Sequence, residues 1–193
     1  MEVKLTNIKG TWEEVANRAR TTVSKGELGK EPSEKFRRRI TMAEHSPIRG
    51  RIYCFKITGL RSWVATHLVR HHVGVEKWVS TQREDRTDNK TPRDELPQGA
   101  LVNMEIEANA QALINISRKR LCTQASPETR AVWQEVKNQV QEADPVIADV
   151  MVKECVYRGF CPEMICCGYV NTEAYQKELK AYRDTISREN KEV

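Results

Sequence analysis

The sequence predicts an α/β protein weighted to helix, in which helices flank a mixed sheet. Residues 102–107 alternate apolar and polar side chains, the period-two pattern of a half-buried strand. Elsewhere apolar residues recur at helical spacing, as at Leu113, Ile114 and Leu121. Because helical and strand segments interleave along the chain, the helices are expected to pack on a sheet.

The first half of the chain carries local signals for where its elements begin and end. Thr11 and Glu14 have the Thr-x-x-Glu spacing of a capping box, and Gly26 and Gly74 are expected to end helices. Gly59 is expected to close a β-rich run, and Ser62 to cap the helix that begins at Trp63. In order, the sequence predicts a helix from residue 12, a loop over 25–33, a basic helix over 35–43, a strand over 51–58 and a helix over 63–73.

The second half continues this alternation. Asn109 and Ser126 are expected N-caps, and Pro127 suits the first position of a helix. In order, the sequence predicts an extended segment over 75–81, a polar stretch over 83–94 with a turn at Asp88-Asn89-Lys90, the strand over 102–107, two helices, a short helix after Pro145, a Cys-containing loop, and a terminal helix with Tyr175, Leu179, Tyr182 and Ile186 on one face.

The length of 193 residues suits one domain with an appendage. Residues 1–145 are expected to form that domain, and residues 146–193 a Cys-containing turn and a C-terminal helix packed on it. No apolar run approaches the ~18 residues of a membrane span, and no signal core is visible, so a cytoplasmic location is expected.

The net charge of +5 suits an anionic ligand, but the basic residues are scattered, so no nucleic-acid partner is expected. Six cysteines are expected as reduced thiols. Cys155, Cys161, Cys166 and Cys167 lack Cys-x-x-Cys pairs, so buried thiols are favoured over a metal site.

The densest chemical cluster is Arg70-His71-His72, followed after seven residues by Ser80 and then by Thr81, Gln82 and Arg83. Arginine forks and hydroxyl groups suit a bound phosphate, although a solvated surface is the plainer interpretation. A second cluster comprises Asn109, Asn115, Arg118 and Arg120, of which Arg120 also suits a helix C-terminus. No glycine-rich phosphate loop or nucleophile elbow is present.

Together these segments resemble the flavin-dependent thymidylate synthases. The family signature Arg-His-Arg, seven residues, Ser is present as Arg70-His71-His72, seven residues, Ser80. His45-Ser46-Pro47 is similar to the family's Ser/Thr-Pro turn, and Arg18-Ala19-Arg20 with Val23-Ser24 to its N-terminal segment. Further matches in order and spacing are Arg93 with Leu96-Pro97, Asn109-Ala110, Leu113, Asn115, Arg120 and Trp133. The resemblance spans roughly residues 18–140 and suggests a divergent, short member, with a viral source left open.

The resemblance implies a flavin-dependent thymidylate synthase-like α/β fold, to which this chain adds a helical, Cys-bearing C-terminal extension. It also implies a homotetramer with FAD and dUMP at subunit interfaces. Members of the family reduce FAD with NADPH and transfer the one-carbon unit of methylenetetrahydrofolate to C5 of dUMP, giving dTMP. Folate and dUMP are therefore the expected partners.

The resemblance also implies roles for individual residues. Arg120 is the expected catalytic residue, acting on the uracil ring. The expected substrate-binding residues are His67, Arg70, Ser80, Thr81, Gln82, Arg83, Arg93 and Arg120. The expected cofactor-binding residues are Ser24, Ser46, Arg70, His71, His72, Trp78, Asn109, Gln111 and Asn115.

Several positions depart from the family pattern, mostly on the flavin side. His72 and Gln111 replace Arg, Trp78 replaces Glu, and Gln82 stands where Arg is usual. Two other hypotheses therefore remain open. One is a divergent member that modifies another pyrimidine nucleotide, for example by hydroxymethylation. The other is a non-catalytic nucleotide- or nucleic-acid-binding protein on the same scaffold.

Overall fold

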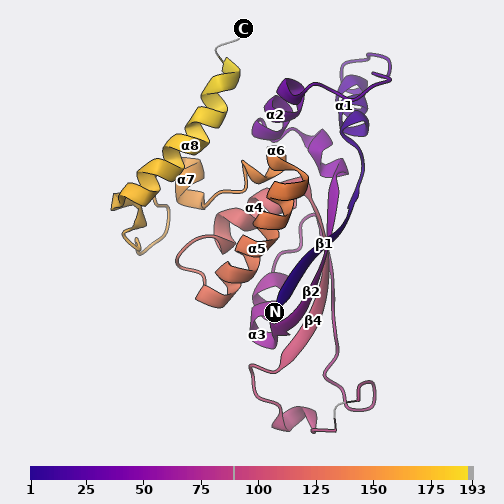
Figure 1. The fold of residues 1–193 in the computed structure, drawn as a ribbon, viewed down its shortest axis with the longest axis vertical. Coiled ribbons are helices and arrows are strands. Elements are labelled where there is room, and N and C mark those ends of the chain that lie inside the picture. Colours follow the sequence, from indigo (N-terminus) through magenta and orange to yellow (C-terminus); the bar gives the residue numbers. More distant parts are fainter. Residues whose placement is uncertain (89, 191–193) are drawn as a thin grey trace.

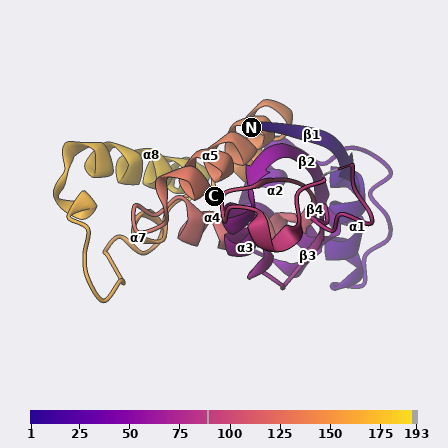
Figure 2. The same ribbon diagram turned by 90° about the horizontal axis from the view of Figure 1, so that it is seen from below.

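A four-stranded sheet forms the centre of the computed structural model, which describes residues 1–88 and 90–190, with side chains as far as residue 185. The strands lie in the order β1-β2-β4-β3 (Figures 1 and 2, with β3 labelled in Figure 2). Their bounds are Glu2–Lys9 for β1, Ile52–Arg61 for β2, Val75–Val79 for β3 and Leu101–Asn109 for β4. Asn89 of the predicted turn and the Ile186 side chain of the predicted helix face lie outside the described part.

The prediction of a mixed sheet is wrong, because all three neighbouring strand pairs are antiparallel. The interleaving of helix and strand does reflect one crossover unit, from β2 through a helix to β3. These two strands run in the same direction, but β4 inserts between them and pairs antiparallel with both. A split unit of this kind has the sequence pattern of a parallel pair without forming one.

Helices cover one side of the sheet and its upper end. Figures 1 and 2 show α4 and α5 between the sheet and the C-terminal helix α8. The helices are α1 (Trp12–Thr21), α2 (Glu34–Met42), α3 (Ser62–Val69), α4 (Ala110–Arg120), α5 (Pro127–Ala143), α6 (Pro145–Ala148), α7 (Glu154–Arg158) and α8 (Glu173–Asn190), with short 3-10 turns η1 (Ser46–Gly50), η2 (Arg93–Glu95) and η3 (Tyr169–Asn171).

Three of the predicted helix limits are wrong. Helix α1 ends at Thr21 and α3 at Val69, so neither helix reaches its expected stop, Gly26 or Gly74. Ser62 is the first residue of α3 rather than its N-cap, and its hydroxyl donates to the Gln98 carbonyl.

The caps predicted at the other helix starts are confirmed. Thr11 and Glu14 form a complete capping box at α1, and the side chains of Asn109 and Ser126 accept backbone N–H groups at the starts of α4 and α5. Each cap satisfies backbone donors that the first turn of a helix leaves unpaired. These signals are local, which is why the sequence alone locates them.

Two strands differ from the prediction because of irregular pairing. Strand β1 was not predicted, since a register shift between Leu5 and Asn7 interrupts the alternation of its apolar residues. Strand β2 continues past Gly59, the predicted end, to Arg61. Gly59 has a φ of +64° and lies within a second register shift, so the glycine forms a bulge that the strand passes through.

The main core fills the space between one face of the sheet and the helices. It includes Phe55, Met104, Leu113 and Trp133, whose indole N–H donates to Ser117 Oγ at 2.9 Å. This cluster continues along the chain to Met151. A smaller cluster comprises Val152, Cys155, Val156, Tyr175 and Leu179 and holds the C-terminal segment together. The division into two domains at residue 145 stays a prediction.

The cysteines are free thiols that differ in burial. Cys155 is buried as predicted, but Cys166 and Cys167 are exposed, so the prediction of buried thiols is wrong for these two. They lie in the loop between α7 and η3. The apolar side chains next to them in this loop, Met164 and Ile165, are themselves exposed and do not cover the two thiols. Within residues 1–88 and 90–190, no group of three potential metal ligands comes together, and no helix is long and apolar enough to cross a membrane.

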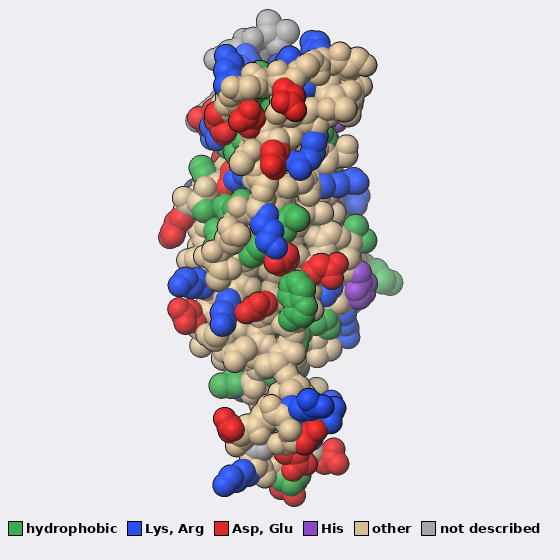
Figure 3. All heavy atoms as spheres, turned by 90° about the vertical axis from the view of Figure 1, so that its right-hand side faces the viewer, with side chains coloured by type: hydrophobic (Ala, Val, Ile, Leu, Met, Phe, Trp, Pro, Cys, Tyr) green, Lys and Arg blue, Asp and Glu red, His purple; other side chains and the backbone are tan. Residues whose placement is uncertain are grey.

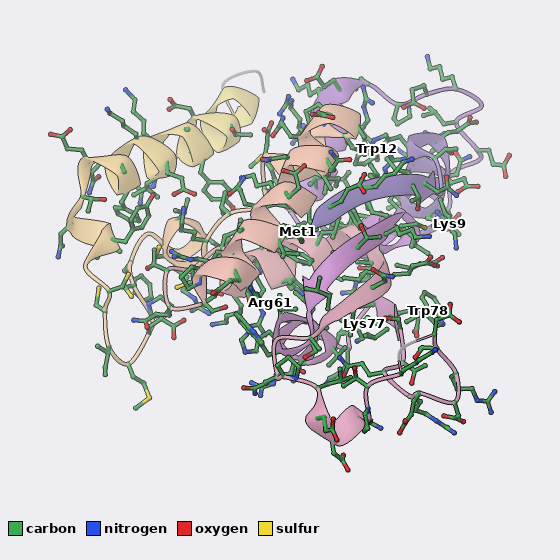
Figure 4. All side chains as sticks on the ribbon, turned by 60° about the horizontal axis from the view of Figure 1, so that its bottom comes forward. Met1, Lys9, Trp12, Arg61, Lys77 and Trp78 are labelled. Carbon is green, nitrogen blue, oxygen red and sulfur yellow. The ribbon has the colours of Figure 1, made fainter. Side chains whose placement is uncertain are left out.

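A buried ion pair joins the sheet to the junction of α5 and α6. Arg51 Nη2 lies 2.6 Å from Asp144 Oδ2, and the Tyr53 hydroxyl donates to the same oxygen at 2.7 Å. Arg51 Nη1 donates to the Gly10 carbonyl, and its guanidinium lies 5.0 Å from the ring centre of Trp12 (labelled in Figure 4). Burial and the nearby carboxylate raise the pKa of Tyr53 far above its ordinary value.

Removing Asp144 is expected to destabilise the fold by about 3–5 kcal/mol, because Asp144→Ala leaves the Arg51 charge buried and unpaired. The control is Glu105→Ala, whose partner Lys56 lies 3.9 Å away with both side chains exposed. That variant is expected to lose at most about 1 kcal/mol. Urea denaturation measures both free energies of unfolding, and equal losses would contradict the structural role of the buried pair.

Candidate functional site

The end of α4 brings Arg120 against the signature segment that follows α3. Arg120 Nε donates to His71 Nε2 at 2.8 Å, and Nη2 donates to the His67 carbonyl at 2.7 Å. Because Nε can only donate, His71 Nε2 accepts, and the neutral ring carries its proton on Nδ1. Burial, together with the charges of Arg120, Lys77 and His72, lowers the pKa of His71 to about 4. The ring is therefore neutral at pH 7 and fixes the direction of the guanidinium.

The described residues provide no carboxylate partner for the positive charge at this point. Burial and the nearby Arg70 charge lower the pKa of Arg120. Among the described residues, neither Arg70 nor Arg120 pairs with a carboxylate, and the Lys77 ammonium contacts the His71 carbonyl. A partly desolvated cation without a counter-ion favours an anionic ligand, which relieves the electrostatic cost of burial.

His67 supports this arrangement from α3. Its Nδ1 lies 2.9 Å from Thr129 Oγ1, and its ring meets the edge of Trp63 at a centroid distance of 5.6 Å. Burial and the charges of Arg120 and Arg70 lower the pKa of His67. The side chain is thus held by α5, while its backbone carbonyl holds Arg120.

The loop after α3 runs along α4 towards its first residue. Arg70 and His72 are exposed on this loop. Gly74 has a φ of +72°, and its carbonyl accepts the Asn109 N–H at 2.9 Å. A Cβ at position 74 would collide with the Asn109 amide. Asn109, a predicted cofactor residue, is therefore first a structural N-cap, held against a glycine that must stay a glycine.

A second polar cluster occupies another face of α4, where Gln111, Asn115 and Arg118 follow at spacings of four and three residues. Gln111 Nε2 donates to Glu44 Oε2 at 2.5 Å and to Asn115 Oδ1 at 3.2 Å. Arg118 pairs with Glu44 Oε1 and also donates to Asn115 Oδ1 at 3.3 Å. Gln111 Oε1 and Arg118 Nε are buried and find no partner among the described residues.

A pocket of about 700 Å³ lies beside this cluster, between α1, α2 and η1. Ala43 and His45, the neighbours of Glu44, both line it, as does the predicted cofactor residue Ser46. Ser24 is exposed just beyond the lining residue Val23, with a φ of +56°. The lining combines apolar Phe36 and Ile40 with polar and basic groups, a mixture that suits a ligand with both rings and charge.

The remaining predicted residues lie at the far end of β3. Trp78 is 55% exposed on this outer strand, next to Lys77 (Figure 4). Ser80 continues the ladder, since its N–H donates to the Asn103 carbonyl and its Oγ accepts the Asn103 N–H, both at 2.8 Å. The other members of this group, in the loop that follows, are Thr81, Gln82, Arg83 paired with Asp85, and Arg93 of η2.

Most of the predicted residues thus form three sets within one chain. One set lies around Arg120 at the end of α4, one lies on the Gln111 face of α4, and one lies at and beyond the end of β3. Val75 pairs with Ala108 and Val79 with Met104, so the two ends of β3 lie about 13 Å apart. Hydrogen bonds join Arg120 to His67 and His71, and Gln111 to Asn115, but among the described residues none joins either set to Ser46, Ser80 or Arg93.

Two contributors were not predicted from the sequence. Glu44 anchors both Gln111 and Arg118, and Lys77 contacts the His71 carbonyl. Glu44 lies in a turn with a φ of +49°, a conformation that its residue type does not indicate. Only the positions that match the family pattern could have been found in advance.

Known proteins resemble this chain in fold and, over residues 88–146, in sequence. The family model Thy1, thymidylate synthase complementing protein, matches residues 88–146. The flavin-dependent thymidylate synthase ThyX from Helicobacter pylori, complexed with FAD and dUMP, has a TM-score of 0.65 at 15% identity, over 79% of this chain and 100% of that chain. The resemblance to the flavin-dependent thymidylate synthases is confirmed.

Two further structures share the fold. A second ThyX structure from H. pylori, with FAD and dUMP, has a TM-score of 0.63 at 15% identity over 78% of this chain and 99% of that chain. The UMP/dUMP methylase PolB from Streptomyces cacaoi, bound with 5-Br dUMP, has a TM-score of 0.62 at 13% identity, over 82% and 95%. No curated protein matches this chain in sequence. The region matched by the family model contains η2, β4, α4 and α5, and therefore Arg93, Asn109 and Arg120.

Replacing His71 with Gln tests the neutral histidine. Between about pH 6.5 and pH 4 the unfolded chain takes up a proton at His71 that the folded chain does not. The stability that this group contributes is therefore complete above pH 6.5 and is lost as the pH falls towards 4. Glutamine keeps an acceptor for Arg120 but does not titrate.

The wild-type advantage in free energy of unfolding over His71→Gln is accordingly expected to shrink between pH 7 and pH 5. Urea denaturation at both pH values measures it, with the exposed neighbour variant His72→Gln as the matched control. An advantage over His71→Gln that does not change with pH would show that His71 is not held neutral.

Proposed function

We propose that the protein is a flavin-dependent thymidylate synthase-type methylase, which transfers the one-carbon unit of methylenetetrahydrofolate to C5 of dUMP and so forms dTMP. The observation that carries this proposal is Arg120, a partly buried guanidinium held by His71 and His67 with no carboxylate partner among the described residues. Such a group is preorganised for a ligand on which negative charge develops.

Arg120 keeps hydrogen-bonding capacity for that ligand. A guanidinium has five N–H groups, and two of them are used on His71 and His67, so three remain. Directed at a uracil ring, these would stabilise negative charge at N3 as the ring becomes activated at C5. A charge-assisted hydrogen bond of this kind contributes about 1.5–3 kcal/mol. Arg70, exposed on the adjacent loop, would add attraction for the nucleotide phosphate.

The residues around Glu44 fit FAD. Gln111 Oε1 is a buried acceptor and Arg118 Nε a buried donor, and both lack a partner among the described residues. The adjoining pocket of about 700 Å³ offers apolar surface beside Ser46 and Arg39, as a flavin with its phosphates requires. Ser46, Gln111 and Asn115 would hold the group, with Ser24, His71, His72, Trp78 and Asn109 as further contacts. Bound FAD, once reduced by NADPH, supplies the hydride.

Site assembly would need more than one copy of the chain. Arg120 follows Gln111 by nine positions along α4. At 100° per residue, Arg120 therefore points about half a turn away from the Gln111 face of the helix. Ser80 and Arg93 lie beyond the end of β3, away from both. A homotetramer in which one copy supplies Arg120, His67 and Arg70 while another supplies Ser80, Thr81, Gln82, Arg83 and Arg93 would complete the dUMP site.

A second pyrimidine substrate is the other candidate. The structural relative PolB is a UMP/dUMP methylase, and in this chain Gln82 stands where an Arg is usual in the family. UMP methylation, or another modification at C5, would use the same Arg120. Nucleic-acid binding has less support, since Lys and Arg side chains are interspersed with Asp and Glu on the face in Figure 3.

Arg120→Gln is expected to raise the dUMP dissociation constant about 10- to 100-fold and to abolish measurable turnover. Lys4→Gln, which removes one exposed charge from β1, is the control and should bind dUMP as the wild type does. Calorimetry measures binding, and mass spectrometry of products from dUMP and UMP identifies the substrate. Unchanged dUMP binding and turnover in Arg120→Gln would refute the proposed role, and a product from UMP alone would favour the second candidate.

A further inference from the structure

The C-terminal segment contacts the face of α4 that carries Gln111 and Asn115. Figure 1 shows α7 beside α4. The ring centre of Tyr157, on α7, lies 3.6 Å from the guanidinium carbon of Arg118. The Tyr157 residue is 42% exposed, whereas the Arg118 side chain is only 13% exposed. The ring therefore covers one face of the guanidinium and attracts its charge through the ring quadrupole.

Arg118 transmits this contact to the residues of the proposed flavin face. Its Nη2 pairs with Glu44, and its Nη1 donates to Asn115 Oδ1 at 3.3 Å. Gln111 Nε2 donates to the second Glu44 oxygen and to the same Asn115 Oδ1. Gln111 and Arg118 both donate to the Asn115 oxygen and hold it towards them. The NH₂ group of Asn115 therefore remains available to a ligand. Asn115 itself is exposed.

A second tyrosine of the segment is affected by the charges of the same cluster. Tyr182, on α8, is partly buried against both core clusters. Burial raises the pKa of Tyr182, with the Arg118 charge opposing this shift and the Glu44 charge adding to it, which is consistent with a location beside that pair. Two aromatic residues from outside the region of family resemblance thus interact with this pair, Tyr157 by ring contact and Tyr182 through the charges of Arg118 and Glu44.

We propose that Tyr157 is a positioning residue for flavin binding: its ring holds Arg118, which with Glu44 and Gln111 orients the Asn115 amide towards the cofactor. This inference rests on the proposed function. It assigns a role to the C-terminal segment, whose α7 and α8 would preorganise the α4 face. Without the ring, Arg118 regains rotational freedom, and ordering it again on binding costs affinity.

The test measures FAD affinity by fluorescence quenching for a set of Tyr157 variants. Tyr157→Leu removes the aromatic face but keeps apolar bulk, and is expected to raise the FAD dissociation constant about ten-fold. Tyr157→Phe keeps the aromatic face and is expected to bind FAD as the wild type does. Phe160→Leu is the matched control, because this aromatic residue of the same segment is 57% exposed. The dUMP dissociation constant should be the same in all variants.

A double-mutant cycle shows whether Tyr157 acts through Arg118. In an Arg118→Met background, Tyr157→Leu is expected to have no further effect on FAD affinity, since the group that it holds is gone. Additive losses would overturn the inference. Tyr157 belongs to neither core cluster, so its variants are expected to fold. Amide hydrogen exchange over residues 110–120 measures how well α4 is ordered. The exchange rate there should rise in Tyr157→Leu but not in Tyr157→Phe or Phe160→Leu.

Failure of the inference and failure of the proposed function give different results. If the wild type binds FAD and Tyr157→Leu binds it equally well with unchanged exchange, Tyr157 has no positioning role and the proposed function stands. If the wild type binds no FAD, the proposed function and this inference both fail.

Discussion

The buried ion pair between Arg51 and Asp144 fixes the regions that carry the candidate site. Its side-chain bonds tie β2 to the end of β1 and to the α5–α6 junction. The Arg51 backbone N–H donates to Ile48 in η1, and its carbonyl accepts the Ala110 N–H at the first residue of α4. The turn that contains Ser46 and the helix that contains Arg120 are therefore positioned by one residue, whose charge cannot lose its partner without a large cost.

Arg51 and Arg120 show how the environment separates a structural arginine from a functional one. Arg51 has a buried carboxylate, a hydroxyl and a backbone carbonyl around it. Among the described residues, Arg120 bonds a neutral imidazole and a carbonyl but no carboxylate, and Arg70 lies nearby. The first charge is satisfied within the fold, whereas the second retains N–H groups and an electrostatic preference for an anion.

The sequence predicted those parts of the fold that depend on local signals. The caps at Thr11, Asn109 and Ser126 and the buried stripe of α4 were predicted because each is encoded within a few residues. Strand direction was not, since the insertion of β4 between β2 and β3 is a long-range event. The two bulges break the period-two pattern. For this reason β1 was not predicted and the predicted β2 ended too early.

For the candidate site, family resemblance supplied the residue types but not their arrangement. Nothing in the spacing of Gln111 and Arg120 indicated that Glu44 would join Gln111 to Arg118, because that contact spans more than 60 residues. The contact of Tyr157 with Arg118 lies outside the resemblance altogether. Such contacts follow from tertiary packing, which residue patterns do not record.

The visible absorption spectrum of the purified protein, recorded with FAD and then with dUMP added, tests the central claim most directly. The account predicts that FAD binds and that dUMP shifts its spectrum, because Arg120 and the Gln111–Asn115 face would contribute to one assembled site. Binding of dUMP without any binding of FAD would contradict the account, and would leave a nucleotide-binding protein on a flavin-dependent synthase fold.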